Sequence, residues 1–456
     1  MPDNVRLSAV ICSSVGLVFV LSIPLVKFIL KRRKSQCRGI DKVGKQLREE
    51  EFDLDEGCSF CNSGSWSCVP RRFIDRQTEL IRQREKNNQL WAIETEPNLI
   101  WESHELLAEF VGAKVENIAI IDNTSTGTNV ALKSQKYSPG DKILLCSFAY
   151  PAVIKQAEAV VQGNPGVELV LFEIPFPIKG EDDIINAYSK ALEEHPGIKI
   201  TVIDHISSDT AILFPIKALV DLCHKHDVMA VIDGAHTPGQ IKLTLEDYGA
   251  DYYVGNLCKW MMIPQNAAFL WVHPKHQDET KPLVTSHTVY AAHFRDRFYP
   301  PMTKDRICHI LVKDAIEFYE ELGGLEAIAA RNAKMVTEAA AMLSEAWGTP
   351  HLEVTRDVRA PHMAVIGLPK DLTEAYVNNT PVDLYHDLMK AGVSVRVSSI
   401  GEETWCRISC HVWNDWDDFE RVRDGVAMLA KNSKMNTGEK IRPPYFVPHS
   451  IMDQTK

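Results

Sequence analysis

The chain has 456 residues, of which 45% are hydrophobic, enough for one large globular domain and a smaller second one. Its 50 Lys and Arg residues against 61 Asp and Glu residues give a formal net charge of −11, which argues against a nucleic-acid-binding protein, because such proteins carry a basic field. Eleven cysteines in a chain of this length exclude a disulfide-dense scaffold, and most stand singly in apolar runs, as buried reduced thiols do.

The first apolar segment runs from Leu7 to Leu30 and is followed at once by the basic cluster KRRK at residues 31–34. Its length is that of a membrane-spanning helix. A cleaved secretory signal is the alternative, but such signals carry their positive charge before the apolar core, and here only one arginine precedes it. Because positive charge stays on the cytosolic side, we expect an uncleaved single-pass anchor over residues 1–34, with the catalytic part of the chain in the cytosol. Residues 35–57 are polar, show no apolar period and are expected to form a tether.

From residue 58 the pattern becomes that of a globular α/β protein. Apolar runs that alternate with amphipathic helices indicate a mostly parallel sheet covered on both faces. Ligands of such sheets bind at the carboxyl ends of the strands, so the residues that follow each strand are the candidates for function. Strands are expected at IAIID (118–122), KILLCSF (142–148), VELVLFEI (167–174), IKITVID (198–204), VMAVID (228–233), ADYYVGN (250–256) and AAFLWVHP (267–274).

The pattern changes after a helix-rich connection at residues 314–347. Three further strands and two helices then indicate a smaller C-terminal α+β domain, which we assign to residues 331–432 beside a large domain over residues 58–330. Residues 433–456 form a polar tail without a retention or peroxisomal signal. The expected strands are HMAVIGL (362–368), VSVRVSS (393–399) and TWCRISCHV (404–412), and the helices lie at 382–392 and 417–431.

Three strand ends carry unusual chemistry. The run NTSTGTN (123–129) opens a helix with small hydroxyl residues and so offers a phosphate cup, although a plain N-cap is the alternative. Asp233 emerges from the end of an apolar strand, so its carboxylate needs a cationic partner or hydrogen bonds. His236 could donate a hydrogen bond into the same pocket. The alternative is a structural Asp that caps the following turn. Asn256 and Lys259 follow a third strand, and a lysine with a lowered pKa can form an imine with an aldehyde.

Together these groups match the needs of one cofactor. A phosphate cup, an Asp for a protonated ring nitrogen and an imine-forming Lys are what a protein requires to hold pyridoxal 5′-phosphate. Each signal is weak alone, but their common place at the ends of strands in one sheet favours this cofactor.

At this point the sequence resembles the class V aminotransferase-like branch of fold-type I pyridoxal-phosphate enzymes, specifically the group named after isopenicillin N epimerase. That group includes cysteine desulfhydrases and C–S lyases. The resemblance covers about residues 58–430 and implies an α/β fold-type I homodimer. Its most specific stretch is DGAHTPGQIKLTLEDYGADYYVGNLCKW (233–260), and DHISSDTAILFPI, PLVTSH, CRISCHVWND and FCNSGSWSCVP (60–70) agree with it.

The resemblance implies a role for each matching residue. Lys259 would form the imine with the cofactor and act as the general base, Asp233 would pair with the pyridine nitrogen, and His236 would hydrogen-bond the ring hydroxyl. Tyr150 would stack on the ring. The implied phosphate contacts are Thr124, Ser125, Asn256 and Thr303, the last in a segment that reaches the second subunit's phosphate. Arg407 would grip the α-carboxylate of an amino-acid substrate, and Asn62, Gly64 and Ser65 lie in the loop that covers it. No metal is implied.

Several positions depart from the family pattern. Cys258 stands where a His is usual, and Met302 and Lys304 replace a Gly and an Arg near Thr303. Cys61 replaces a Leu, and Phe148 with Ala149 replaces a more polar pair. These changes bear on phosphate affinity and substrate choice.

The early cysteines offer a competing signal. Cys58, Cys61 and Cys68 form C-x2-C-x6-C, half of a zinc pattern, but no second pair follows at suitable spacing. A reactive thiol near the substrate and a quiet packing role are the other interpretations of Cys61.

The expected protein is therefore a membrane-anchored, homodimeric pyridoxal-phosphate lyase that performs β-elimination at a cysteine-like sulfur centre. An epimerase or an aminotransferase of the same family is the alternative. A desulfurase needs a mobile catalytic cysteine late in the chain, whereas Cys406 and Cys410 lie in an apparent strand. A different class of function is a membrane-bound pseudo-enzyme that binds the cofactor and serves as a scaffold.

Overall fold

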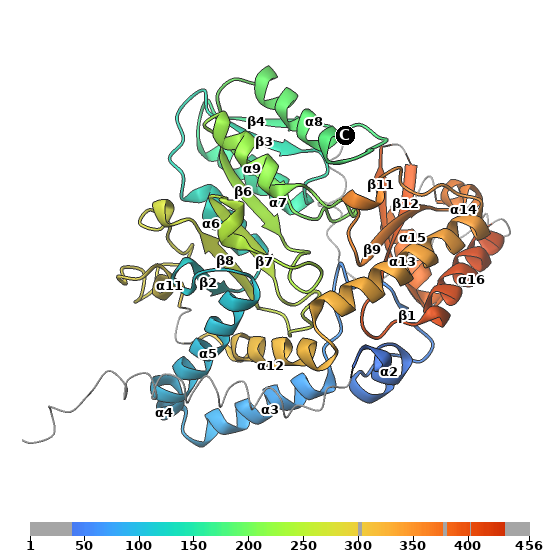
Figure 1. Ribbon diagram of the computed structural model, residues 1–456, viewed down its shortest axis with the longest axis horizontal. Helices are drawn as coiled ribbons and strands as arrows, with labels where there is room; N and C mark the ends of the chain where they lie inside the picture. The colour runs from blue at the N-terminus through green and yellow to red at the C-terminus, as the bar shows by residue number, and fades with distance from the viewer. Residues whose placement is uncertain (1–38, 300–302, 377–380, 402, 434–456) are drawn as a thin grey trace, which may run out of the picture.

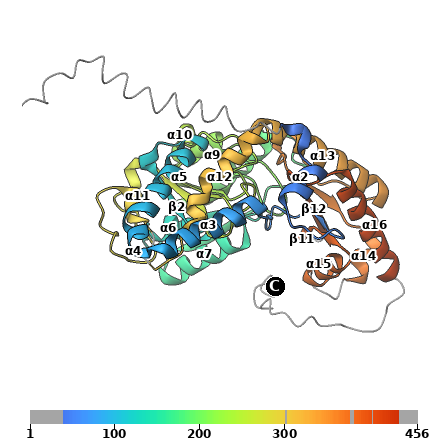
Figure 2. The same cartoon turned by 90° about the horizontal axis from the view of Figure 1, so that it is seen from below.

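The computed structural model describes residues 39–299, 303–376, 381–401 and 403–433, which form a large domain and a smaller one beside it (Figures 1 and 2). The predicted anchor at residues 1–34 and the polar tail from residue 434 lie outside these ranges. Within them, no helix has both the length and the apolar composition that crossing a bilayer requires.

A seven-stranded sheet forms the centre of the large domain, in the order β2-β8-β7-β6-β5-β3-β4. Only β8 runs antiparallel to its neighbours, so the prediction of a mostly parallel sheet is confirmed. β8 turns back because residues 257–267 alone join it to β7, and a parallel crossover needs a dozen or more residues. The strands are β2 (Ile118–Ile121), β3 (Lys142–Cys146), β4 (Glu168–Phe172), β5 (Ile198–Asp204), β6 (Met229–Gly234), β7 (Tyr252–Asn256) and β8 (Ala268–Val272).

Helices cover both faces of this sheet because its strands present apolar side chains to both sides. One core joins α6 and α7 to strand residues such as Leu145 and Val231, and a second core joins α5, α8, α9 and α12 to residues such as Leu144 and Ile232. The helices are α3 (Arg71–Lys86), α4 (Asn88–Leu90), α5 (Glu96–Phe110), α6 (Thr124–Lys133), α7 (Pro151–Gly163), α8 (Glu181–Glu194), α9 (Ile216–Lys225), α10 (Leu245–Tyr248), α11 (Phe294–Arg297) and α12 (Ile307–Glu321).

The small domain is built on an antiparallel sheet in the order β11-β12-β9. The expected connection at residues 314–347 is two helices, because Gly323 and Gly324 turn the chain with φ of 105° and 86° between α12 and α13. The elements are α13 (Leu325–Trp347), β9 (Met363–Gly367), α14 (Lys370–Ala375), α15 (Pro381–Lys390), β11 (Arg396–Ile400), β12 (Glu403–Ser409) and α16 (Trp416–Ser433).

The segment before residue 58 differs from the expected tether, because its residues from 39 onward are folded. In α2 (Lys45–Glu51) the side chain of Leu47 is fully buried. The ring of Phe52 lies 4.9 Å from that of Trp413, centroid to centroid. Two well-placed apolar residues therefore anchor a stretch whose overall composition is polar.

The N-terminal segment contacts both domains. β1 (Ser59–Phe60) pairs in parallel with β10 (Val393–Ser394) of the small domain, while Glu51 at the end of α2 pairs with Arg72 of α3 in the large domain. An ion pair of 2.9 Å between Arg48 Nη1 and Asp418 Oδ1 fastens the same segment to α16.

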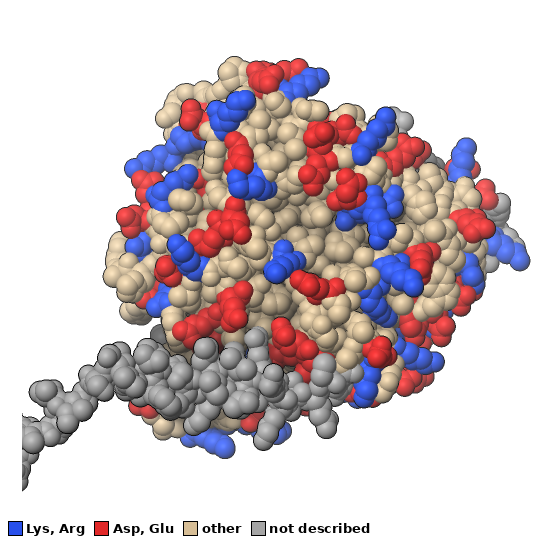
Figure 3. Space-filling view, in the orientation of Figure 1, with Lys and Arg blue, Asp and Glu red and all other residues tan. Residues whose placement is uncertain are grey.

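Charge is mixed over the surface. On the face in Figure 3, acidic and basic side chains are interspersed over both domains, and they form no single basic field there.

Candidate active site

Lys259 lies in the short connection from β7 to β8, at the carboxyl edge of the parallel strands. Its Nζ is 2.9 Å from His236 Nε2, so the two predicted residues do meet. Burial, reinforced by the positive charge of Arg407, lowers the pKa of Lys259 to about 8. A substantial fraction of the amine is therefore neutral near physiological pH, which is the form that attacks a carbonyl.

Asp233 ends β6 at the same edge and is 4% exposed. Its Oδ1 accepts a hydrogen bond of 2.9 Å from the N–H of Ala235, and the other oxygen has no donor among the described residues. Burial raises the pKa of Asp233, while Lys259 and the Ala235 N–H oppose that rise. A cationic ring nitrogen would supply the partner that this carboxyl lacks.

Sequence reasoning missed a second carboxyl at this edge. Asp204 ends β5 and is the register partner of Asp233 on the neighbouring parallel strand, so both side chains point to the same face. Asp204 is 6% exposed, and burial together with Asp233 raises its pKa well above the usual value. The signal was in the sequence, because IKITVID and VMAVID end alike in Asp.

This pair predicts a pH-dependent stability. A carboxyl that holds its proton more tightly when folded stabilises the native state below its unfolded pKa, and that contribution is lost as pH rises toward the raised pKa. We therefore expect Asp204→Asn to leave the stability of the cofactor-free protein unchanged near pH 3.5 and to increase it at pH 8, by about 1.4 kcal/mol for each unit by which folding raises the pKa of the replaced carboxyl. Urea unfolding across this pH range measures the difference. Asp278→Asn, at a fully exposed side chain, is the control, and a destabilised Asp204→Asn protein at pH 8 would contradict the prediction.

The predicted phosphate cup is the first turn of α6. Asn123 caps this helix, and its Oδ1 accepts a hydrogen bond of 2.8 Å from the N–H of Thr126. The N–H groups of Thr124 and Ser125 precede any intrahelical acceptor and are available to an anion. Gly127 lets the helix approach the sheet, because a Cβ there would lie 2.4 Å from Val254 Cγ1.

Cys258, which stands beside Lys259 where the family usually has a His, contacts the side chain of Asn256. Both its N–H and its Sγ reach Asn256 Oδ1, at 3.1 and 3.0 Å. These contacts fix the carboxamide with its oxygen toward Cys258, which leaves the NH2 group without a described partner. The amide nitrogen is thus free to donate to a ligand, and the phosphate contact of Asn256 stays a prediction.

Arg407 on β12 meets the predicted substrate loop. Its Nη2 donates to Asn62 Oδ1 at 3.0 Å and to Ser65 Oγ at 3.1 Å. Gly64 lies against it, since a Cβ there would be 2.7 Å from Nη2. The side chain is fully buried, and burial lowers the pKa of Arg407 to about 10.

No carboxylate among the described residues ion-pairs with this buried guanidinium. The negative charge of Asp209 acts on Arg407, but that carboxylate forms its ion pair with Arg396. A buried charge without a directly paired counterion is unfavourable, so Arg407 is suited to bind a carboxylate from outside the chain. Sequence reasoning missed Ser208, whose backbone oxygen accepts from Arg407 Nη1 at 2.6 Å, and Ser409, whose Oγ accepts from the Gly64 N–H at 3.3 Å.

Two predicted residues are not joined to this group by any hydrogen bond or ion pair among the described residues. Tyr150 precedes α7 and is 44% exposed, so its ring is free to stack on a ligand. Thr303 is exposed, and the ion pair of the next residue, Lys304, with Asp122 holds its segment near the start of α6. Their cofactor roles stay predictions.

The early cysteines do not form a metal centre in the described part of the chain, where no three His, Cys, Asp or Glu side chains are placed to hold an ion. Cys61 is fully buried in the small-domain core, and burial raises the pKa of its thiol well above the usual value. Its environment is that of a packing residue rather than a reactive thiol.

Comparison with known proteins decides the family. The family model for class-V aminotransferases matches residues 74–422. The chain belongs to the class-V aminotransferase family. Pyridoxal 5′-phosphate is its cofactor, and four features of the site fit that group. They are the buried and unpartnered Nδ1 of His236, the carboxyl of Asp233, the amide of Asn256 and the first turn of α6.

Several relatives of this class-V aminotransferase chain have names that refer to amino-acid chemistry. It is 29% identical over 438 residues to "Putative L-cysteine desulfhydrase 1" of Oryza sativa subsp. japonica, covering 87% of this chain and 88% of that one. It is 26% identical over 394 residues to "Isopenicillin N epimerase" of Streptomyces clavuligerus, covering 82% and 96%.

Solved structures share the class-V fold. The apo cysteine desulfurase from Thermococcus onnurineus NA1 matches with a TM-score of 0.69 at 18% identity, over 86% of this chain and 98% of that one. The cystine C–S lyase C-DES in complex with cysteine persulfide matches with a TM-score of 0.67 at 19% identity, over 82% and 98%.

Proposed function

We propose that the protein is a pyridoxal-phosphate-dependent lyase that cleaves the C–S bond of cysteine or of an S-substituted cysteine by β-elimination. The observation that carries this proposal is the burial of both late cysteines. Cys406 lies within β12 and Cys410 directly after it, both are 0% exposed, and burial raises the pKa of each thiol to about 12. Neither can act as the mobile thiol that a desulfurase uses to accept sulfur. The names of the desulfhydrase relatives support the same reaction.

The roles of the chain's residues follow from their positions. Pyridoxal phosphate supplies an aldehyde for the substrate amine and a ring that withdraws electrons from Cα. Arg407 binds the α-carboxylate and so orients the substrate. Lys259 accepts the Cα proton, for which its lowered pKa suits it, and His236 positions the Lys259 amine. Asp233 would hold the ring nitrogen of the cofactor and stabilise positive charge there.

The overall reaction balances with one molecule of water as the only other reactant. The Cα–H proton goes to Lys259, and the Cβ–S bond breaks with its electron pair on sulfur. Water then hydrolyses the remaining three-carbon part of the substrate. Cysteine therefore gives sulfide, pyruvate and ammonia, and an S-substituted cysteine gives the corresponding thiol instead of sulfide.

The test is product analysis. The purified holoenzyme, incubated with L-cysteine and with S-alkyl cysteines, is expected to release pyruvate and ammonia in equal amounts, with one sulfide or thiol each. Release of the D-enantiomer without pyruvate would assign an epimerase, and keto acid formation that requires an added amino acceptor would assign an aminotransferase. A protein that stays colourless with added cofactor would be the scaffold of the alternative hypothesis.

We also propose that the enzyme is a homodimer anchored in a membrane by residues 7–30, with its catalytic domain in the cytosol. The apolar run and the KRRK cluster support the anchor. The segment before Thr303 supports a protein interface, because Leu283, Val284 and Tyr290 are 44%, 67% and 83% exposed. Carbonate extraction of membranes tests the anchor, and light scattering of the detergent-solubilised protein tests the dimer.

A further inference from the structure

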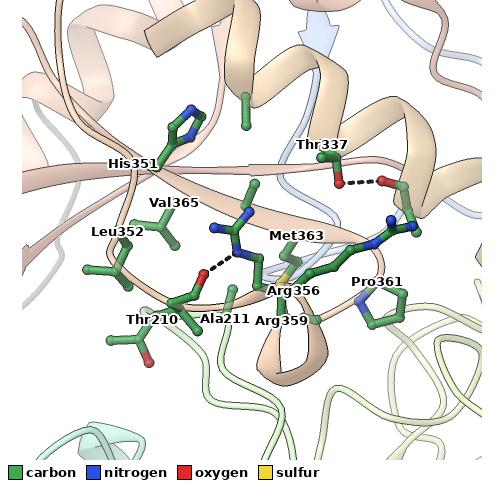
Figure 4. A pocket seen from close by; sticks show the side chains of 15 residues that line it. Thr210, Ala211, Thr337, His351, Leu352, Arg356, Arg359, Pro361, Met363 and Val365 are labelled. Carbon is green, nitrogen blue, oxygen red and sulfur yellow. Dashed lines mark hydrogen bonds between the residues drawn. The ribbon is translucent and has the colours of Figure 1, made fainter. Parts of the chain in front are cut away.

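A pocket of about 170 Å³ lies in the small domain, outside the group around Lys259. It is bounded by α13, β9 and the loop at residues 349–362 that joins them, and Thr210 and Ala211 close it from the loop after β5 (Figure 4). None of the functional assignments above uses this space.

Two arginines from the 349–362 loop, Arg356 and Arg359, reach into the pocket near His351 and Thr337 (Figure 4). Arg359 Nε donates a hydrogen bond of 2.6 Å to the backbone oxygen of Val354, which fixes the guanidinium plane and leaves both terminal NH2 groups without a described acceptor. Arg356 likewise has no hydrogen-bond acceptor among the described residues.

The positive charge of this pocket is not compensated. Its lining contains no Asp or Glu, although the chain has 61 acidic residues. No carboxylate of the described residues ion-pairs with Arg356 or Arg359, whereas Arg48, Arg72 and Arg396 all have one. Arg356 and Arg359 are both exposed at the mouth of the pocket, where a ligand from solvent can reach them. Partial burial lowers the pKa of Arg359, and burial together with the positive charge of Arg359 lowers the pKa of His351.

Apart from Thr210, Thr337 and His351, the rest of the lining is apolar. Leu352, Val354, Met363 and Val365 form a large part of the wall, and all four are buried. A cavity of about 150 Å³ with such walls holds a molecule the size of benzene. The space therefore fits a small molecule with a compact apolar part and a negatively charged end that contacts the two guanidinium groups.

We propose that this pocket binds a small organic oxyanion, a carboxylate or a phosphate ester with a compact apolar body, at a site separate from the substrate. Guanidinium groups bind both kinds of oxyanion through paired hydrogen bonds. The pocket shares a wall with the substrate loop. A Cβ built on Gly64 would lie 2.9 Å from Met363 Sδ and 2.7 Å from Arg407 Nη2, so an occupant that moves Met363 also changes the surroundings of Arg407. The inference does not depend on which reaction the enzyme performs.

Calorimetric titration of the cofactor-loaded protein tests this site, because bound cofactor fills the phosphate cup. Benzoate and phenyl phosphate are the two anionic probes, and benzyl alcohol is the neutral probe. We expect at least one anion to bind and the alcohol to bind about tenfold more weakly or not at all. The stronger of the two anions identifies the ligand class.

Variants locate the binding. Arg356→Gln and Arg359→Gln are each expected to weaken the anion about tenfold or more, the usual effect of losing one charged hydrogen-bond partner. Arg359→Lys tests whether the fork geometry matters. Arg423→Gln, at a half-buried arginine of α16 outside the pocket, is the control that should bind as the wild type does. Unaltered melting temperatures show that the loop remains folded. Anion binding that survives both Gln variants, or that a substrate analogue displaces competitively, places the anion at Arg407 and overturns the proposal, as does failure of both anions to bind.

Discussion

Replacing Lys259 by alanine is expected to abolish the visible absorbance of the lysine-bound cofactor and to lower kcat/KM by about 10²–10⁴-fold or more, the range that loss of a general base alone produces. The side chain is the only amine within reach of His236 in the described residues, so no neighbour replaces it. Absorbance spectra of the dialysed protein and initial rates with L-cysteine measure the two effects. Lys242→Ala, at an exposed side chain, is the matched control.

The lowered pKa of Lys259 adds a pH dependence to this prediction. Only the neutral amine attacks the cofactor aldehyde, so the rate at which the cofactor-free protein captures pyridoxal phosphate should rise with pH and level off above about 8. A rate that keeps rising toward the pKa of an ordinary lysine, or a Lys259→Ala protein that retains the visible band after dialysis, would show that this amine is not the attachment point.

Arg407→Gln is expected to have the second largest effect, a rise in KM that lowers kcat/KM for L-cysteine. The factor should correspond to a free energy of about 2–5 kcal/mol, because loss of one partner from a buried charge pair costs that much. Arg407→Lys keeps the charge but loses the paired geometry, so we expect an intermediate value. Steady-state kinetics at several substrate concentrations separate KM from kcat.

Cysteamine, which is cysteine without its carboxylate, is the matched substrate control. The wild type should strongly prefer cysteine to cysteamine, and Arg407→Gln should lose most of that preference while keeping its cofactor absorbance and melting temperature. If the variant discriminated between the two substrates as well as the wild type does, the carboxylate would have to bind elsewhere.

Much of the large domain could be predicted because its information is local. Strands such as IKITVID are apolar and β-branched, and their order along the chain fixes a parallel sheet whose carboxyl edge collects the residues that follow. Asp233, His236 and Lys259 lie on consecutive segments of that edge, and the structure brings them together.

The features that could not be predicted from the sequence depend on contacts between distant segments. The acidic pair of Asp204 and Asp233 follows from the register of two strands, and register depends on the whole sheet. Likewise, nothing near residue 208 indicates that its backbone oxygen accepts from Arg407, 199 residues away. The folded state of the segment around α2 was missed because Phe52, just after that helix, packs on Trp413, which is encoded at the other end of the chain.

The pairing of β1 with β10 has a practical consequence for shortening the protein. A deletion that ends before residue 39 removes the apolar run and leaves every described contact in place. A deletion that extends to residue 70 would remove Asn62, Gly64 and Ser65 together with the edge strand that holds them, and would leave Arg407 without two of its hydrogen-bond acceptors. A fragment that lacks the apolar run and retains activity should therefore begin between the basic cluster and residue 39. A protease that cuts the chain between residues 61 and 69 should inactivate the enzyme although it leaves Asp233, His236 and Lys259 in place.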